Sequence, residues 1–287
     1  MSAWTVIGGS VRGTSHERRS QPCQDAWAWQ EISRDPGDHA ANYLCVAISD
    51  GAGSASHSDL GSQTAVKVAV EAIAQIITAG TDCPDTDPQS PAELERWRSP
   101  LQNSFTQVQQ TLKNLAQDKE IALRDLACTL LIMVWTPAGI VALQVGDGAI
   151  IGREPGGQLI ALTQPHQGEY ANQTLFVIDE RAAEETQFIH WSAPMSHVAL
   201  FSDGLQRLAL ELPSGKPFTP FFDPLFTFVD QVHQSQSTSG DRPALLQDAT
   251  ETLEKFLRSP RVISRTDDDL TLALIAGSPG PSKSGKG

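Results

Sequence analysis

Residues 43–51 read Tyr43-Leu44-Cys45-Val46-Ala47-Ile48-Ser49-Asp50-Gly51, an apolar run that ends in an aspartate and a glycine. A continuous apolar run of this kind is typical of a strand that is buried on both faces. A strand holds the carboxylate that follows it in a fixed place, and the glycine lets the backbone turn and expose a carbonyl. The stretch therefore predicts a buried strand that delivers a metal ligand.

At four other places an aspartate likewise stands at the end of an apparent strand. They are Gln24-Asp25, Gly146-Asp147-Gly148, Asp203-Gly204 and Asp267-Asp268-Asp269. Carboxylate and backbone oxygens are the ligands that hard divalent ions prefer. If the strands bring these sites together, they form one cluster of oxygen ligands.

The spacing of apolar residues predicts strands and helices in turn along the chain. Strands are expected over residues 4–9, 26–29, 43–49, 127–135, 140–145, 149–153, 159–162, 175–179, 186–191, 198–202 and 270–275. Helices are expected over 59–77, over about 100–118, and over 222–258 with a break at 234–240. Residues 80–92 are expected to form a mobile loop, and turns are expected at 136–139 and 155–157. Two sheets packed together, with helices outside, would bury these runs.

The composition allows one sizeable domain, because the 287 residues are 40% hydrophobic. We expect this domain over residues 1–277 and a disordered tail, rich in Gly, Ser, Pro and Lys, over 278–287. The chain has no run of about 18 apolar residues and no signal peptide. We therefore expect no membrane association and a cytoplasmic protein.

The cysteines and the charge restrict the chemistry further. The four cysteines form no C-x-x-C pair; Cys45 and Cys128 are expected to be buried, and Cys23 to lie near Asp25. A formal charge of −13 without a basic tract argues against nucleic acid as a partner. A bound phosphate would need local positive charge, which metal ions in the carboxylate cluster would supply.

The order and context of these motifs resemble the metal-dependent Ser/Thr protein phosphatases of the protein phosphatase 2C (PP2C, PPM) family. The resemblance covers about residues 3–276 and is greatest to the compact bacterial branch. It is carried by Pro22-Cys23-Gln24-Asp25-Ala26 and Ser49-Asp50-Gly51-Ala52-Gly53-Ser54-Ala55. It implies an α+β fold, a four-layer α-β-β-α sandwich of two mostly antiparallel sheets with helices outside.

The resemblance assigns metal ligands to several of the acidic sites. Asp50 corresponds to the aspartate that bridges two metal ions, and the Gly51 carbonyl to a backbone ligand of one of them. Asp203 corresponds to a second metal aspartate. The third metal aspartate lies in the run Asp267-Asp268-Asp269, and the position of Leu270-Thr271 favours Asp268 for this role.

Two further sites depart from the family pattern. Asp25 corresponds to an acidic position that acts through bound water, but Gln24 stands before it where many relatives have glutamate. Asp147 corresponds to an aspartate that helps to hold a weaker third ion, with Gly148 where a serine is common. The alternative for Asp147 is a hairpin turn closed by Asp-Gly.

The cation that orients the phosphate is expected just before Asp25. Arg19 is the first choice because a planar guanidinium can grip two phosphate oxygens, and Arg18 and His16 are the alternatives. Some relatives have a proton-donating histidine two residues after the bridging aspartate, where this chain has Ala52. The general acid is then His57, another group or a metal-bound water, and His57 itself is expected to be merely exposed.

The resulting hypothesis is a phosphatase with two Mg²⁺ or Mn²⁺ ions and a weaker third. A hydroxide that bridges two ions would attack the phosphorus of phosphoserine or phosphothreonine in a phosphoprotein, which a cognate Ser/Thr kinase would have phosphorylated. The first alternative is a weakly active or inactive relative, a pseudophosphatase that acts as a binding or signalling module, for which Gln24 and Ala52 leave room. The second alternative is a phosphatase for small molecules.

Overall fold

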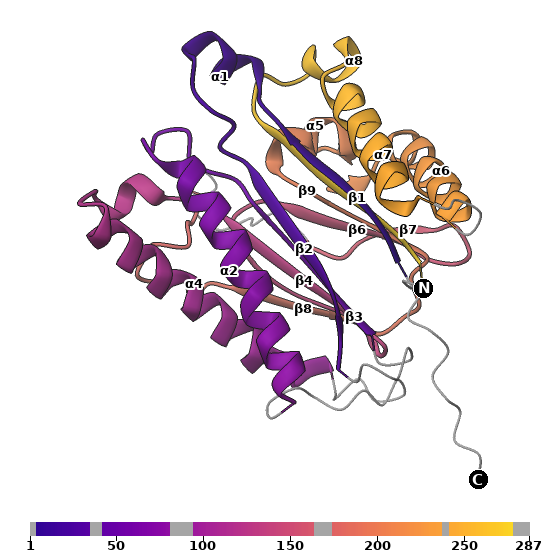
Figure 1. Cartoon of the computed structure of the whole chain (residues 1–287). Helices are drawn as coiled ribbons and strands as arrows, with labels where there is room; N and C mark the ends of the chain where they lie inside the picture. Colours follow the sequence, from indigo (N-terminus) through magenta and orange to yellow (C-terminus); the bar gives the residue numbers. More distant parts are fainter. Residues whose placement is uncertain (1–3, 35–41, 81–93, 164–173, 237–240, 278–287) are drawn as a thin grey trace.

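Two five-stranded antiparallel sheets lie face to face between two layers of helices (Figure 1). The computed structural model describes residues 4–34, 42–80, 94–163, 174–236 and 241–277. The first sheet has the order β1-β12-β9-β6-β7 and the second β2-β3-β4-β5-β8. The strands are β1 (Trp4–Val11), β2 (Ala26–Ser33), β3 (Asn42–Ser49), β4 (Leu130–Thr136), β5 (Gly139–Val145), β6 (Ala149–Arg153), β7 (Leu159–Ala161), β8 (Gln187–Trp191), β9 (His197–Phe201) and β12 (Leu270–Gly277).

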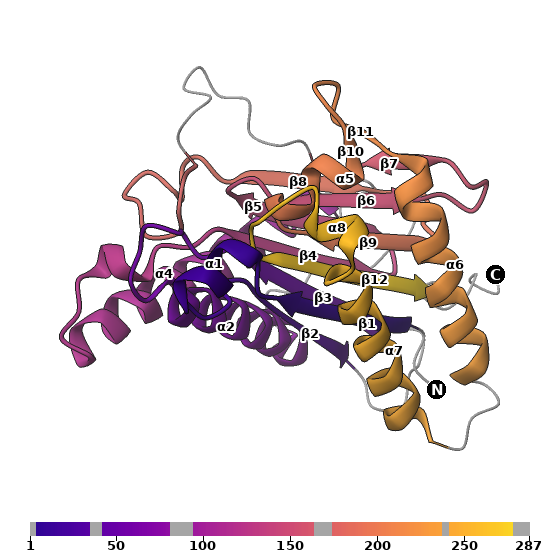
Figure 2. The same ribbon diagram turned by 90° about the horizontal axis from the view of Figure 1, so that it is seen from above.

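Two long helices cover the outer face of each sheet, as Figures 1 and 2 show. Helices α2 (Ser58–Ala79) and α4 (Arg98–Asp118) cover the β3 sheet, and α6 (Thr219–Gln236) and α7 (Arg242–Leu257) cover the β12 sheet. Short elements complete the chain: α1 (Thr14–Arg19), η1 (Leu123–Leu126), η2 (Asp203–Leu205), α5 (Gln206–Ala209), β10 (Leu210–Glu211), β11 (Lys216–Pro217) and α8 (Pro260–Ile263).

Strand β3 explains why its sequence is apolar without alternation. Leu44, Val46 and Ile48 belong to the apolar layer between the sheets. Cys45 and Ala47 point the other way, into the layer beneath α2 and α4. Because successive side chains of a strand point to opposite faces, a strand covered on both sides must be apolar throughout.

The expected fold class is confirmed, with two antiparallel sheets and helices outside. The turns at 136–139 and 155–157 join β4 to β5 and β6 to β7. Cys45 and Cys128 are buried as expected. Most of the expected loop at 80–92 and the expected tail at 278–287 lie outside the described residues. Across the part of the chain that is described, no helix has the length and apolar character needed to cross a bilayer.

The strand expected at 175–179 is wrong, because these residues form turns. The amide of Phe176 donates to the side chain of Asp179, and the amide of Val177 donates to the carbonyl of Cys128. The side chain of Gln109 on α4 donates to the Val177 carbonyl. The backbone amides and carbonyl of this segment are therefore paired with nearby residues and with a side chain of α4. They do not pair with a neighbouring strand, contrary to our expectation.

Candidate active site

Five aspartates lie where strands of the two sheets begin or end. Asp25 directly precedes β2 and Asp50 directly follows β3, and the pairing of Ala26 with Ser49 makes them neighbours. Asp203 follows β9 and Asp268 stands shortly before β12, which pairs with β9. Asp147 lies between β5 and β6, which belong to different sheets, so the alternative of a hairpin turn is wrong.

The five carboxylates share one electrostatic environment. Burial raises the pKa of Asp50 well above its ordinary value, and repulsion from Asp25 and Asp203 adds to the rise. Burial likewise raises the pKa of Asp25 to about 7 and that of Asp147 to about 6, with repulsion from Asp203 contributing to both. Burial and the charge of Asp203 also raise the pKa of Asp268. The sequence motifs therefore do converge into one cluster of carboxylates, of which Asp25 is buried, Asp50, Asp147 and Asp203 are partly buried and Asp268 is exposed.

Several oxygens in the cluster have no hydrogen-bond donor. They are Oδ1 of Asp25, Oδ1 of Asp203 and Oε1 of Gln24, all of them buried. A buried carboxylate oxygen without a donor costs free energy unless a cation or water approaches it. These unpartnered oxygens, together with the mutual repulsion, indicate a site that positive charge would stabilise.

The donor set fits a sparsely ligated hard cation. Among the described residues, no group of three or more His, Cys, Asp or Glu side chains is arranged to hold a metal ion by itself. The site is therefore no closed cage of side chains. Magnesium in proteins is commonly held by one or two carboxylates and keeps several waters, and an all-oxygen donor set suits magnesium and manganese. The carboxylates fit ions of this class, with water completing the coordination.

The backbone around Asp50 is held from both sides. Thr129 accepts a hydrogen bond from the Asp50 amide at 2.9 Å through Oγ1, and its own amide donates to the Asp50 carbonyl at 2.8 Å. The amide of Gly51 donates to the carbonyl of Gln24 at 3.1 Å. A Cβ on Gly51 would lie 2.7 Å from that oxygen and 2.8 Å from Cβ of Ser58, so packing within the chain requires the glycine. A metal-binding role of the Gly51 carbonyl stays a prediction.

Asp269 has a structural role that the sequence did not reveal. It is 2% exposed, and its two oxygens accept hydrogen bonds of 2.6 Å from the amides of Gly13 and Gln24. Nδ1 of His16 lies 2.9 Å from the same carboxylate. Hydrogen bonds within the chain therefore occupy both oxygens of Asp269, and the other two members of the run, Asp267 and Asp268, border the open site.

Two glycines pack closely against the backbone of residues 267–269. A Cβ on Gly13 would lie 2.2 Å from the carbonyl oxygen of Asp268, and a Cβ on Gly204 would lie 2.2 Å from that of Asp269. Real Cβ atoms do not approach backbone atoms so closely. The glycine of Asp203-Gly204 therefore lets two strand ends approach each other, which brings Asp203 next to Asp268.

The candidates for phosphate binding and proton donation lie in different environments. Arg18 is exposed and pairs with Asp267 at 3.1 Å, and Arg19 is exposed without an ion pair to any described residue. His16 is 4% exposed and faces Asp269, so it is the least accessible of the three phosphate candidates. His57 is exposed, as expected, and Ala52 is buried.

Cys23 lies beside the aspartates, as expected. Its Sγ is 3.7 Å from the carbonyl oxygen of Asp25. Burial, with repulsion from Asp25 and Asp269, raises the pKa of the thiol far above its ordinary value. Because the thiolate is the nucleophilic form of cysteine, this residue is not suited to attack a substrate.

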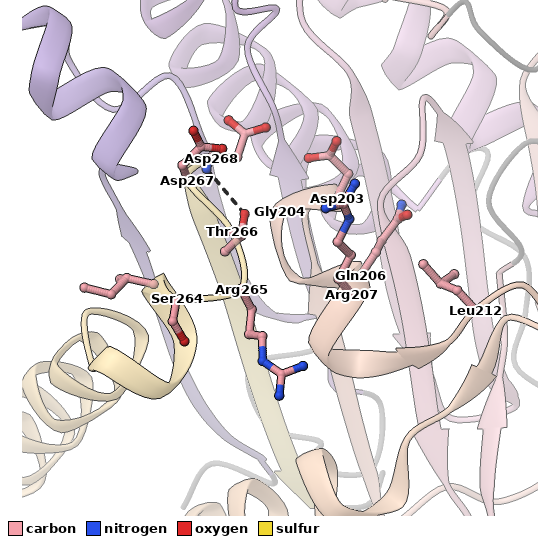
Figure 3. A pocket seen from close by; sticks show the side chains of 11 residues that line it. Asp203, Gly204, Gln206, Arg207, Leu212, Ser264, Arg265, Thr266, Asp267 and Asp268 are labelled. Carbon is pink, nitrogen blue, oxygen red and sulfur yellow. Dashed lines mark hydrogen bonds between the residues drawn. The ribbon is translucent and has the colours of Figure 1, made fainter.

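A cavity of about 640 Å³ opens next to the cluster (Figure 3). Asp203, Asp267 and Asp268 gather at one end, and the side chain of Arg265 extends away from them. Arg207 lines the same cavity, and neither arginine was identified from the sequence. No sequence signal marked them, because an exposed arginine outside a motif resembles any other surface charge.

A family model described as protein phosphatase 2C matches residues 12–258. Serine/threonine-protein phosphatase 3 from Escherichia coli (strain K12) is 36% identical over 276 residues, which cover 95% of this chain and 98% of that protein.

Solved structures with low sequence identity share the fold. The serine/threonine phosphatase of S. agalactiae has a TM-score of 0.54 at 15% identity, covering 96% of this chain and 100% of that chain. Serine/threonine phosphatase Stp1 from Staphylococcus aureus has a TM-score of 0.53 at 14% identity, covering 96% of this chain and 95% of that chain. From the family model and the curated relative, the chain belongs to the protein phosphatase 2C family, and as a member it is a protein-serine/threonine phosphatase.

Proposed function

We propose that this phosphatase is metal-dependent and hydrolyses phosphoserine or phosphothreonine in a phosphoprotein with two Mg²⁺ or Mn²⁺ ions and a weaker third. The observation that carries the proposal is the cluster of aspartates whose pKa values are raised by burial and by mutual repulsion, while two of their oxygens lack a donor. The ions, when bound, would supply a water nucleophile of lowered pKa and positive charge for the phosphoryl oxygens. We place this chemistry in one domain over residues 1–277.

The aspartates and one backbone carbonyl would hold the ions. Asp50, on which the charges of both Asp25 and Asp203 act, would bind both principal ions, with the Gly51 carbonyl as a further ligand. Asp203 and Asp268 would bind from the other sheet. Asp147, the remaining member of the cluster, would hold the weaker third ion.

Other groups would orient water and phosphate. Asp25 and Gln24 are buried beside Asp50, and each keeps one oxygen without a donor. Each could therefore accept a hydrogen bond from water next to the ions. Arg19 remains our first choice for the phosphate oxygens, because Arg18 already pairs with Asp267 and His16 is buried. With alanine at position 52 and His57 exposed, water is our choice for protonating the leaving hydroxyl.

No observation favours the pseudophosphatase or a phosphatase for small molecules, so neither is proposed. A cognate Ser/Thr kinase as partner and a cytoplasmic location stay predictions. Phosphoprotein profiling of cells without the gene, and cell fractionation, would test them.

The test is hydrolysis of p-nitrophenyl phosphate with and without Mn²⁺, for the wild type and Asp203→Asn. We expect manganese-dependent turnover that falls by at least about 10³-fold in the variant, because one carboxylate ligand becomes a neutral amide. Asp248→Asn is the matched control, because it makes the same change at an exposed aspartate on α7 that does not line the cavity beside the cluster. Equal turnover of Asp203→Asn and wild type would refute the proposed role of the cluster.

A further inference from the structure

A second, largely apolar cavity lies next to the one beside the aspartates. Its volume is about 770 Å³, and α6, α7, α8 and the β10–β11 hairpin contribute to its wall. Apolar residues line it: Leu208, Leu210, Phe218, Pro220, Phe221, Pro224, Leu225, Phe228, Leu253, Phe256 and Val262. Arg207 and Arg265 line both cavities, so the two are adjacent and share these arginines in their walls.

Large apolar side chains around the two cavities are exposed to solvent. Among the described residues, the large hydrophobic residues classed as exposed are Leu212 at 56%, Phe218 at 40% and Ile263 at 40%. Leu212 and Ile263 line the cavity beside the aspartates, and Phe218 lines the apolar one. Apolar exposure that gathers at one place marks a binding surface more often than scattered exposure does.

The same surface carries unpaired positive charge. Arg207, Arg261 and Arg265 are exposed, and their guanidinium groups make no ion pair or hydrogen bond with any described residue. The whole chain has a formal charge of −13, so an acidic ligand is repelled at long range and needs local cations to bind. A planar guanidinium fits a carboxylate through two parallel hydrogen bonds.

We propose that the two cavities form one docking groove for the segment of the substrate protein next to its phosphorylated residue. This inference rests on the proposed function. The phosphorylated side chain enters beside Asp203 and Asp268, a neighbouring acidic side chain meets Arg207 and Arg265, and a neighbouring apolar side chain enters the apolar cavity. The presence of Asp203 and Asp268 in the wall of the first cavity favours a substrate over a second copy of the chain, because a permanent dimer here would obstruct the site.

The test compares three phosphopeptides that differ only beside the phosphothreonine: aspartate with leucine, lysine with leucine, and aspartate with alanine. For wild type we expect kcat/KM to be highest for aspartate with leucine. In Arg265→Glu, the preference for aspartate over lysine should fall by at least about tenfold, because an attractive charge becomes a repulsive one. In Phe218→Ala, the preference for leucine over alanine should fall about threefold.

Lys113→Glu is the matched control, because it makes the same change of charge at an exposed position on α4, which covers the other sheet. It should keep the wild-type preferences. Each kcat/KM is divided by the kcat/KM for p-nitrophenyl phosphate, which has no flanking residues. A loss of activity that affects both substrates equally is thereby removed from the comparison. Unchanged preferences in Arg265→Glu and Phe218→Ala would overturn the docking groove.

A binding measurement separates this inference from the proposed function. Anisotropy of the labelled aspartate–leucine phosphopeptide in EDTA reports on the groove without turnover. If p-nitrophenyl phosphate is not hydrolysed but the peptide binds and Arg265→Glu weakens it, the proposed function fails and the groove stands. If light scattering finds a dimer that Arg265→Glu dissociates while peptide binding is unchanged, the surface is a self-interface and the inference is wrong.

Discussion

The hydroxyl of Ser202 donates a hydrogen bond of 2.7 Å to Oδ2 of Asp25 and so joins the two sheets at the candidate site. Ser202 follows β9 in one sheet, and Asp25 precedes β2 in the other. The serine oxygen in turn accepts the amide of Thr271 at 3.0 Å. One oxygen of Asp25 is therefore held in place while the other, Oδ1, is buried without a donor.

Replacing this serine should weaken metal binding without removing a proposed ligand. In Ser202→Ala, we expect the Mn²⁺ concentration for half-maximal hydrolysis of p-nitrophenyl phosphate to rise about tenfold, the scale on which supporting hydrogen bonds affect metal affinity. The hydrogen bond from Ser202 also lowers the pKa of Asp25, so its loss would favour the protonated acid, which binds cations poorly. Ser235→Ala, on the outer helix α6, is the control. An unchanged midpoint would show that the hydroxyl does not support the site.

Removing the carboxylate of Asp269 should destabilise the whole fold. Asp269→Ala leaves the amides of Gly13 and Gln24 without their acceptor and removes the partner of His16. We expect the free energy of unfolding to fall by about 2–4 kcal/mol, because buried hydrogen-bond donors are left without an acceptor. Asp267→Ala removes only an exposed pair with Arg18 and should cost at most about 1 kcal/mol. Urea denaturation measures both, and equal losses would contradict the structural role of Asp269.

The layers of the fold and the aspartate cluster could be predicted from the sequence. The side chains that hold them in place through long-range hydrogen bonds could not. Strand β3 could be recognised because burial on both faces leaves a continuous apolar run. The support of Asp25 by Ser202 joins residues 177 positions apart, and nothing local in the sequence marks such a contact. The turn at 175–179 was mistaken for a strand because Gln109, far away on α4, supplies a hydrogen bond there.

Asp50 and Asp147 should differ sharply in importance. The charges of Asp25, Asp203 and Asp268 all act on Asp50, whereas Asp147 lies in the crossing between the sheets, where Oδ2 is 3.4 Å from the hydroxyl of Thr174. We expect Asp50→Ala to lower kcat by at least about 10³-fold, and Asp147→Ala by about tenfold at saturating Mn²⁺. Steady-state kinetics over a range of Mn²⁺ concentrations tests this. An Asp50→Ala variant with wild-type turnover would exclude the assignment of the bridging ligand.

The metal-free protein should become more stable as the pH falls from 8 to 6. The pKa of Asp25 is raised from 3.8 to about 7 and that of Asp147 to about 6, so in this range the folded state binds more protons than the unfolded state. Stability then decreases as the pH rises through these values, and we expect about 1–2 kcal/mol between pH 6 and 8 in EDTA.

Saturating Mn²⁺ should reverse this dependence, because bound cations favour the ionised carboxylates and binding releases protons. Thermal unfolding in EDTA and in Mn²⁺, at each pH, measures both slopes. Asp25→Asn, which cannot ionise, should flatten the slope in EDTA, whereas Asp267→Asn at the surface should leave it as in the wild type. A metal-free protein whose stability rises steadily from pH 6 to 8 would contradict the raised pKa values that burial and repulsion give Asp25 and Asp147, since these carboxylates would then be ionised without cost.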